Sequence, residues 1–183
     1  MYKNSNNDLW VKFLAGDNEA ISTLYKEFAH DLYSYGRRLT KDEHLVKDCI
    51  QEVFIQIIDK RRKLILTMNI HIYLFKSLRN KILEVLRSEN RKQSIVYQIA
   101  ADENNLGRNA EQFMIDLEDE KDTRKIISNA ISNLPNRQGE IIYLKYTEGL
   151  NYDEIAQLLQ IDKASARTLL YRSLKSIKDQ MGK

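Results

Sequence analysis

The side chains best suited to chemistry lie on one basic face near the C-terminus, between residues 163 and 178. Apolar residues at helical spacing are expected to face inward there: Ala166, Leu169, Leu170, Leu174 and Ile177. Cations and hydrogen-bonding groups fall on the other side: Lys163, Ser165, Arg167, Thr168, Tyr171, Arg172, Lys175 and Lys178. Because cations bind phosphates while arginines and hydroxyls also bind base edges, the pattern predicts a recognition helix for the DNA major groove.

Helix start and stop signals place this basic helix directly behind a shorter one. Asn151 and Glu154 have the spacing of a capping box, and an apolar stripe follows them at Ile155, Leu158 and Leu159. Asp162 then supplies a new N-cap, while Pro135 and Gly149 mark the two ends of a further helix upstream. A charged face alone is also typical of a solvated bundle helix. The capped helix pair with its short turn instead favours a helix-turn-helix.

The composition predicts an all-α protein with two small helical domains. A chain of 183 residues can form one large domain or two small ones. One proline and six glycines, with 43% hydrophobic and 30% charged residues, argue against a sandwich or barrel. The hydrophobic period weakens in the middle of the chain, where acidic residues are frequent. We therefore expect domains at 1–92 and 121–183, joined by an acidic linker at 93–120.

Helical patterns fill the first expected domain. Asn4 to Asp8 can cap a helix from Leu9, and Gly16-Asp17 opens a second pattern. Its expected core residues are Ala20, Leu24, Phe28, Leu32, Tyr33 and Tyr35. Asp42 starts a third helix, whose expected inward residues are Leu45, Cys49, Ile50, Val53, Phe54, Ile57 and Ile58.

Two polar faces in this domain are candidate binding surfaces. The third helix has an acidic and amide-bearing side formed by Asp48, Gln51, Glu52 and Gln56, which by itself is typical of a solvated face. A fourth helix carries apolar residues from Tyr73 to Leu86. Its polar side holds Lys76, Arg79, Asn80, Lys81 and Arg87. The cations of this side can hold a phosphate backbone while the Asn80 amide reads an exposed base.

Enzymatic, metal-binding and membrane-spanning classes lack support in the sequence. His30, His44 and His71 are scattered, and no Ser-His-Asp set, paired carboxylates or Gly-rich phosphate loop occurs. We expect no enzyme, no cofactor and no metal site. Cys49 is the only cysteine, so a reduced core thiol is expected. Without a signal-peptide run or a membrane-spanning apolar run, the sequence favours a cytoplasmic protein.

Three segments carry a family resemblance. Residues of the first are Leu134-Pro135, Gly149-Leu150, Tyr152, Glu154-Ile155-Ala156, Leu159, Ala166-Arg167 and Tyr171-Arg172-Ser173-Leu174-Lys175. This segment resembles region four of bacterial sigma factors of the extracytoplasmic function (ECF) group. The segments from Asp48 to Phe54 and from Tyr73 to Arg87 resemble parts of sigma region two. Two departures are Gln160, where the family often has a turn glycine, and Asp162-Lys163-Ala164 in place of a Ser-containing start.

The resemblance implies a subunit that directs RNA polymerase to promoters and helps to initiate transcription. The recognition helix would bind the −35 element, and the basic polar side around Asn80 would bind the melted −10 element. The loop from Lys60 to Asn69 would receive a flipped base. The acidic side around Glu52 would dock on the clamp helices of the polymerase core, with the flap as a second contact. The resemblance also implies an anti-sigma factor as a further partner.

A polymerase-independent regulator is the alternative function. It would have one helix-turn-helix and would dimerise through its N-terminal half. Such a regulator binds its site alone and with strong salt dependence, whereas a sigma factor needs core polymerase for tight promoter binding. The linker also leaves two interpretations open, a segment that runs toward the RNA-exit path and a plain solvated tether.

Overall fold

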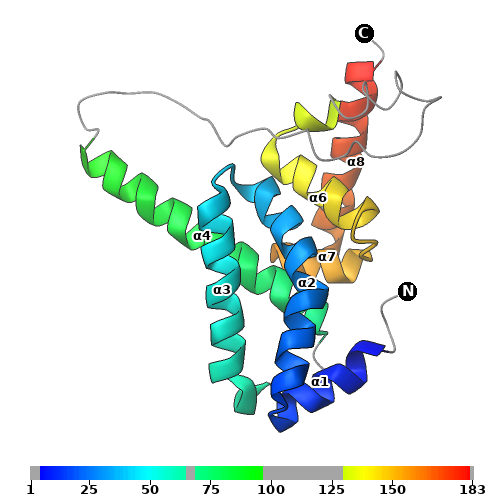
Figure 1. Ribbon diagram of the computed structural model, residues 1–183. Helices are drawn as coiled ribbons and strands as arrows, with labels where there is room; N and C mark the ends of the chain where they lie inside the picture. The colour runs from blue at the N-terminus through cyan, green and yellow to red at the C-terminus, as the bar shows by residue number, and fades with distance from the viewer. Residues whose placement is uncertain (1–4, 65–68, 97–129, 182–183) are drawn as a thin grey trace, which may run out of the picture. The chain divides into compact units, whose positions relative to one another are not determined.

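The computed structural model describes residues 5–64, 69–96 and 130–181 (Figure 1). Within these ranges the regular structure is helical throughout, with no strand, as the composition predicts. The helices form two compact units, α1 to α4 with one 3-10 turn, and α6 to α8, which are described separately. Most of the predicted linker lies outside the described residues; its first positions, 93–96, are the end of a helix.

The first unit is built from four α-helices whose bounds follow local capping signals. They are α1 (Ser5–Ala15), α2 (Asn18–Leu39), α3 (Glu43–Asp59) and α4 (Ile70–Val96), with η1 (Arg61–Lys63) after α3. The Asp17 carboxylate accepts a hydrogen bond from the Glu19 N–H at 2.8 Å, and that of Asp42 accepts from Leu45 at 3.0 Å. These side chains satisfy amides that a helix start leaves without partners. α1 begins earlier than the predicted Leu9.

The core of the first unit contains most of the residues that the periodicity selected. Side chains of α2, α3 and α4 are buried together: Ala20, Leu24, Phe28, Leu32, Tyr35, Cys49, Ile50, Val53, Phe54, Ile57, Leu74, Phe75, Leu78 and Ile82. Three expected core residues lie nearer the surface, since Tyr33 and Leu45 are half-buried and Ile58 is exposed. Gly36 has no room for a side chain, because a Cβ there would lie 2.6 Å from Cγ1 of Val46.

Three helices of the second unit lie wholly within the described residues, α6 (Asn136–Tyr146), α7 (Tyr152–Leu159) and α8 (Lys163–Met181), and residues 130–132 before them are also helical (Figure 1). Pro135 immediately precedes α6, and Gly149 lies in the loop after it with φ +66°. α8 packs against both α6 and α7. The shared core is formed by Ile141, Leu144, Ile155, Leu158, Leu159, Ala166 and Leu170. This core fixes which side of α8 faces solvent.

Candidate nucleic-acid interface

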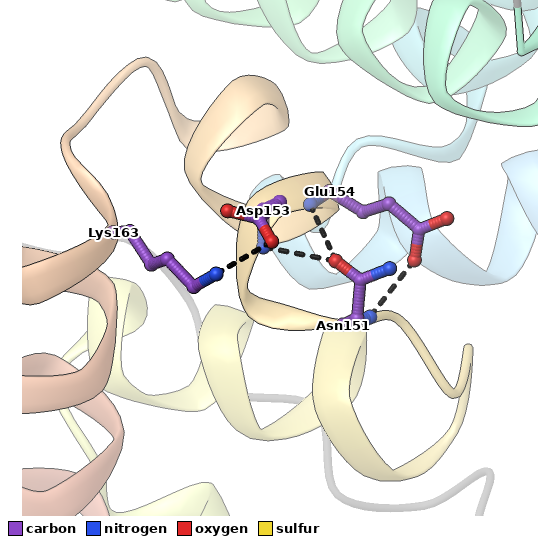
Figure 2. Close-up of polar contacts among 4 residues, drawn as sticks. All are labelled: Asn151, Asp153, Glu154 and Lys163. Carbon is purple, nitrogen blue, oxygen red and sulfur yellow. Dashed lines mark hydrogen bonds and ion pairs between the residues drawn. The ribbon is translucent and has the colours of Figure 1, made fainter.

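The start of α7 is held by a reciprocal pair of side-chain hydrogen bonds (Figure 2). The Asn151 side chain accepts from the N–H groups of Asp153 at 2.9 Å and Glu154 at 3.0 Å. The Glu154 carboxylate accepts from the Asn151 N–H at 2.8 Å, which completes the predicted capping box. Lys163 at the start of α8 reaches back to Asp153 at 2.7 Å, so an ion pair also spans the turn.

The turn between α7 and α8 is only three residues long. Gln160 ends α7 in the left-handed region, with φ 56° and ψ 49°, and its N–H donates to Ala156. Glycine favours that conformation, which explains why the family often has glycine here. Asp162 caps α8, since its carboxylate accepts from the Ser165 N–H at 2.7 Å and from the Ser165 hydroxyl at 2.6 Å. These hydrogen bonds hold the pKa of Asp162 below its ordinary value, and the bond from the Ser165 hydroxyl is the largest cause.

The polar side of α8 lies at the surface along its whole length. The predicted outward residues are all exposed: Lys163, Ser165, Arg167, Thr168, Tyr171, Arg172, Lys175 and Lys178. Ala166 and Leu170 are buried as predicted, and Leu169 and Ile177 are half-buried. The prediction for Leu174 is wrong, because that side chain is 40% exposed.

Ser173 takes the inward place that the pattern gave to Leu174. It is fully buried, and its hydroxyl donates to the Leu169 carbonyl at 2.8 Å. Positions 166, 170 and 173 follow the i, i+4, i+7 spacing of one helix face, and a serine fits there because its hydroxyl is satisfied within the helix. Hydrophobicity alone does not reveal such a residue.

Tyr152 is a component of this surface to which the sequence pattern gives no role. Its half-buried ring has two cations nearby, the Arg167 guanidinium at 5.5 Å and the Lys145 ammonium at 5.1 Å from the ring centroid. The Lys145 ammonium also donates to the Leu150 carbonyl at 3.2 Å. Each of the three residues comes from a different helix, so no local pattern could have predicted the cluster.

The acidic face of α3 is exposed as predicted. Its members are Asp48, Gln51, Glu52 and Gln56. Ile55 lies in the same stretch and is 57% exposed, which makes the face mixed rather than purely polar. A single exposed apolar side chain is normal on a protein surface, so Ile55 does not by itself mark a binding site. Its exposure was predictable from the sequence, since Ile55 falls outside the apolar stripe of α3.

The basic side of α4 is less accessible than that of α8. Asn80 and Arg87 are exposed, whereas Lys76, Arg79 and Lys81 are half-buried. The Lys81 ammonium forms an ion pair with the Glu52 carboxylate of α3. The hydrogen bond that the Lys81 ammonium donates to Glu52 within this ion pair raises the pKa of Lys81. The structure thus joins a predicted DNA contact to a predicted polymerase contact.

The flanking aromatic residues and the predicted base pocket can be placed in part. Phe75 is buried in the core, while Tyr73 is half-buried. The pocket was predicted in the loop from Lys60 to Asn69, and its positions 65–68 lie outside the described residues.

Other chemistry finds little support in the described part of the chain. Burial, followed by the negative charge of Glu52, raises the pKa of Cys49 to about 11, so its thiol stays protonated. Residues 5–64, 69–96 and 130–181 contain no group of three potential metal ligands. Among the helices described, none has the length and apolar character needed to cross a membrane.

The fold and the exposed basic helix define a helix-turn-helix protein with a second helical unit. The family model of Sigma-70 region 2 matches residues 24–92, and that of Sigma-70, region 4 matches residues 124–177. Together the two matches cover about two thirds of the chain and leave out residues 1–23, 93–123 and 178–183. The chain belongs to the ECF sigma factors, which are non-enzymatic regulators that direct RNA polymerase to promoters.

Individual relatives agree with this assignment. The chain is 25% identical over 166 residues to the ECF RNA polymerase sigma factor SigM of Bacillus subtilis (strain 168), covering 86% of this chain and 93% of the relative. The fold is similar to that of the sigma factor RpoE of Bartonella quintana, with TM-score 0.65, 16% identity and coverage of 88% and 96%. It is equally similar to CnrH, with TM-score 0.65, 14% identity and 96% coverage of both chains.

Proposed function

We propose that the two units divide promoter recognition between them. α8 binds the −35 element, the basic side of α4 binds the −10 element, and the acidic face of α3 docks on the clamp helices of RNA polymerase. The observation that carries this proposal is the exposure of the whole predicted polar side of α8, on a helix whose first turn is fixed by Asp162. On this proposal the functional domains span 1–92 and 121–183, with the linker at 93–120.

Position along α8 separates two kinds of DNA contact. The first turns of a recognition helix reach base edges, which makes Arg167 and Thr168 the base-reading residues, with Lys163 and Ser165 beside them. The Ser165 hydroxyl is already bound to Asp162, so its role is to hold the helix start. Farther along, the exposed Arg172 and Lys175 hold phosphates, with Tyr171 between these two groups.

The surfaces of the first unit suit partners of opposite charge. Asp48 and Glu52 offer carboxylates to cationic helices of the polymerase, and charge complementarity then sets the register of docking. Asn80 is the exposed amide for an unstacked −10 base, with the basic residues of α4 holding the backbone around it. The Glu52–Lys81 ion pair opens when each residue engages its partner.

Two further features of the function follow by analogy. RNA polymerase acts in the cytoplasm, so we place the protein there. The similar sigma factor RpoE was solved in complex with the anti-sigma factor NepR. By analogy, an anti-sigma factor holds this chain inactive until a signal releases it.

Co-purification and promoter binding test the proposal together. The full chain should elute with core polymerase, and tight promoter binding should require both proteins. Tight, strongly salt-dependent DNA binding by the chain alone, without polymerase association, would favour the polymerase-independent regulator. A helical bundle whose charged faces are merely solvated would bind neither.

A further inference from the structure

We propose that Tyr152 is a positioning residue for Arg167 and thereby a determinant of base preference. This inference deepens the proposed function and rests on the base-reading role of Arg167. Tyr152 is the first residue of α7, and Arg167 lies on α8. The proposed role is to hold the guanidinium in the orientation that a base edge requires, without touching the base.

The geometry is that of a cation–π contact. The Arg167 guanidinium carbon lies 5.5 Å from the centroid of the Tyr152 ring, within the roughly 6 Å over which a ring attracts a cation. The backbone that carries the ring is fixed at the start of α7, because the neighbouring Asn151 caps the helix through its N–H and its side chain. A half-buried ring on this anchored helix start therefore meets a long, exposed side chain.

Lys145 strengthens the same arrangement from α6. Its ammonium lies 5.1 Å from the ring centroid and donates to the Leu150 carbonyl at 3.2 Å, so it is tied to the loop before α7. The ring thus lies close to two positive charges, and repulsion between them disfavours orientations in which Arg167 folds back toward Lys145. The remaining orientations carry the guanidinium toward solvent, where DNA would lie.

Holding the Arg167 guanidinium in place before DNA binds should affect base discrimination more than overall DNA affinity. A bidentate contact to a base needs the planar guanidinium fork in one orientation, whereas a phosphate contact needs only a nearby charge. Removing the ring leaves the charge of Arg167 in place but releases its orientation. The loss should therefore appear as weaker base discrimination at the positions that Arg167 reads, with the salt dependence unchanged.

The test uses the reconstituted holoenzyme and a promoter library randomised across the upstream element. Arg167→Ala first identifies the base pairs whose preference depends on that side chain. Tyr152→Leu should then lower preference at those same base pairs by about two- to five-fold, the size of an exposed cation–π contact. Tyr152→Phe should retain the preference. Tyr146→Leu, which removes an exposed tyrosine from α6, is the matched control and should change nothing.

Several results would overturn the positioning role of Tyr152. Equal loss at all base pairs from Tyr152→Leu, or a loss from Tyr152→Phe as large as from Tyr152→Leu, overturns the positioning role. If Tyr152→Leu does not fold, Tyr152→Trp and Tyr152→Phe provide the test, because preference should rise with the cation affinity of the ring, and an unordered series rejects the proposal. If Arg167→Ala flattens no base pair, the base-reading assignment fails, and the positioning role with it.

Discussion

The two helices predicted to bind DNA present their cations in different ways. On α8 the polar side is exposed from Lys163 to Lys178, and the contacts made by Arg167 leave it at the surface. On α4, by contrast, three of the predicted cations are half-buried and Lys81 is paired with Glu52 of α3. Within the described residues, the α8 surface has one ion pair, between Lys163 and Asp153, and that pair lies within its own helix-turn-helix. The pair on α4 instead joins two different candidate binding surfaces.

This difference indicates how binding events are coupled. Apart from Lys163, which is paired with Asp153 of α7, the DNA-binding residues proposed on α8 form no ion pair with the described part of the chain that DNA would have to break. Lys81 and Glu52 are paired in the first unit. On the proposed function, a partner that takes Glu52 would release Lys81, and a phosphate that takes Lys81 would release Glu52. Because the two events favour each other, polymerase docking and −10 contact should be linked there, whereas −35 contact by α8 is independent of this ion pair.

The largest effect is expected from a charge reversal in the Glu52–Lys81 ion pair. Glu52→Lys should weaken association with core polymerase by on the order of 1–3 kcal/mol, because it reverses a docking charge and places a second cation beside Lys81. Fluorescence anisotropy of labelled chain titrated with core polymerase measures the change. Glu27→Lys, at an exposed position of α2, is the matched charge reversal and should have no effect.

A second variant sharpens the contrast within the pair. Lys81→Gln frees the Glu52 carboxylate and should leave polymerase association intact or tighter. The same variant should weaken binding of the holoenzyme to a pre-melted −10 strand. Reduced polymerase association in Lys81→Gln would mean that the ion pair is needed to build the docking face, and the coupling argument would then be wrong.

On α8, we expect Arg167→Ala and Lys175→Ala to differ in kind. Arg167→Ala should cost about 1–3 kcal/mol on the preferred −35 sequence and flatten preference at one or two base pairs. Lys175→Ala should weaken binding to all sequences alike and lower the salt slope by about one unit, since one phosphate loses its contact. Holoenzyme binding to single-base promoter variants at several salt concentrations separates the two.

One result would contradict the base-reading role of Arg167. If all promoter variants respond to Arg167→Ala and Lys175→Ala in the same proportion, Arg167 holds the backbone and does not read a base. The polar side of α8 would then be a uniform phosphate-binding surface.

Local chemistry made much of the fold predictable from the sequence. The capping box at Asn151, the N-caps at Asp42 and Asp162 and the inward stripes of α2 and α3 depend on residues within a few positions of one another. The exposed side of α8 follows from the same periodicity. The family resemblance added the meaning of these surfaces, since an acidic face on α3 is by itself no sign of a partner.

Contacts between helices could not be predicted in the same way. The Glu52–Lys81 ion pair and the Tyr152 cluster depend on how helices far apart in sequence pack together. The burial of Ser173 could not be predicted from hydrophobic periodicity, because serine is polar. It is tolerated in the core because its hydroxyl donates to a carbonyl of its own helix. These features determine which of the predicted binding residues are free to act.

A smaller effect is expected at the turn that orients α8. Gln160 has φ 56°, a conformation that costs a residue with a Cβ more than it costs glycine. Gln160→Gly should stabilise the second unit by about 0.5–1 kcal/mol, part of the relief being offset by the greater entropy of glycine in the unfolded chain. Native-state hydrogen exchange of α8 amides measures this change. Gly149→Ala, at φ +66°, should shift the same amides in the opposite direction.

The smallest expected effect concerns the pKa of Asp162 at the start of α8. The hydroxyl and N–H of Ser165 donate to its carboxylate and lower the pKa, with the hydroxyl as the larger cause. Since the folded pKa is the lower one, the cap stabilises α8 above the ordinary Asp pKa and is lost as pH falls through the folded value. Ser165→Ala should raise the pKa in an NMR titration of the Asp162 carboxyl, yet leave it below the ordinary value because the Ser165 N–H remains. An unchanged pKa would show that the backbone alone holds the cap, and Ser165 would then be free to contact DNA.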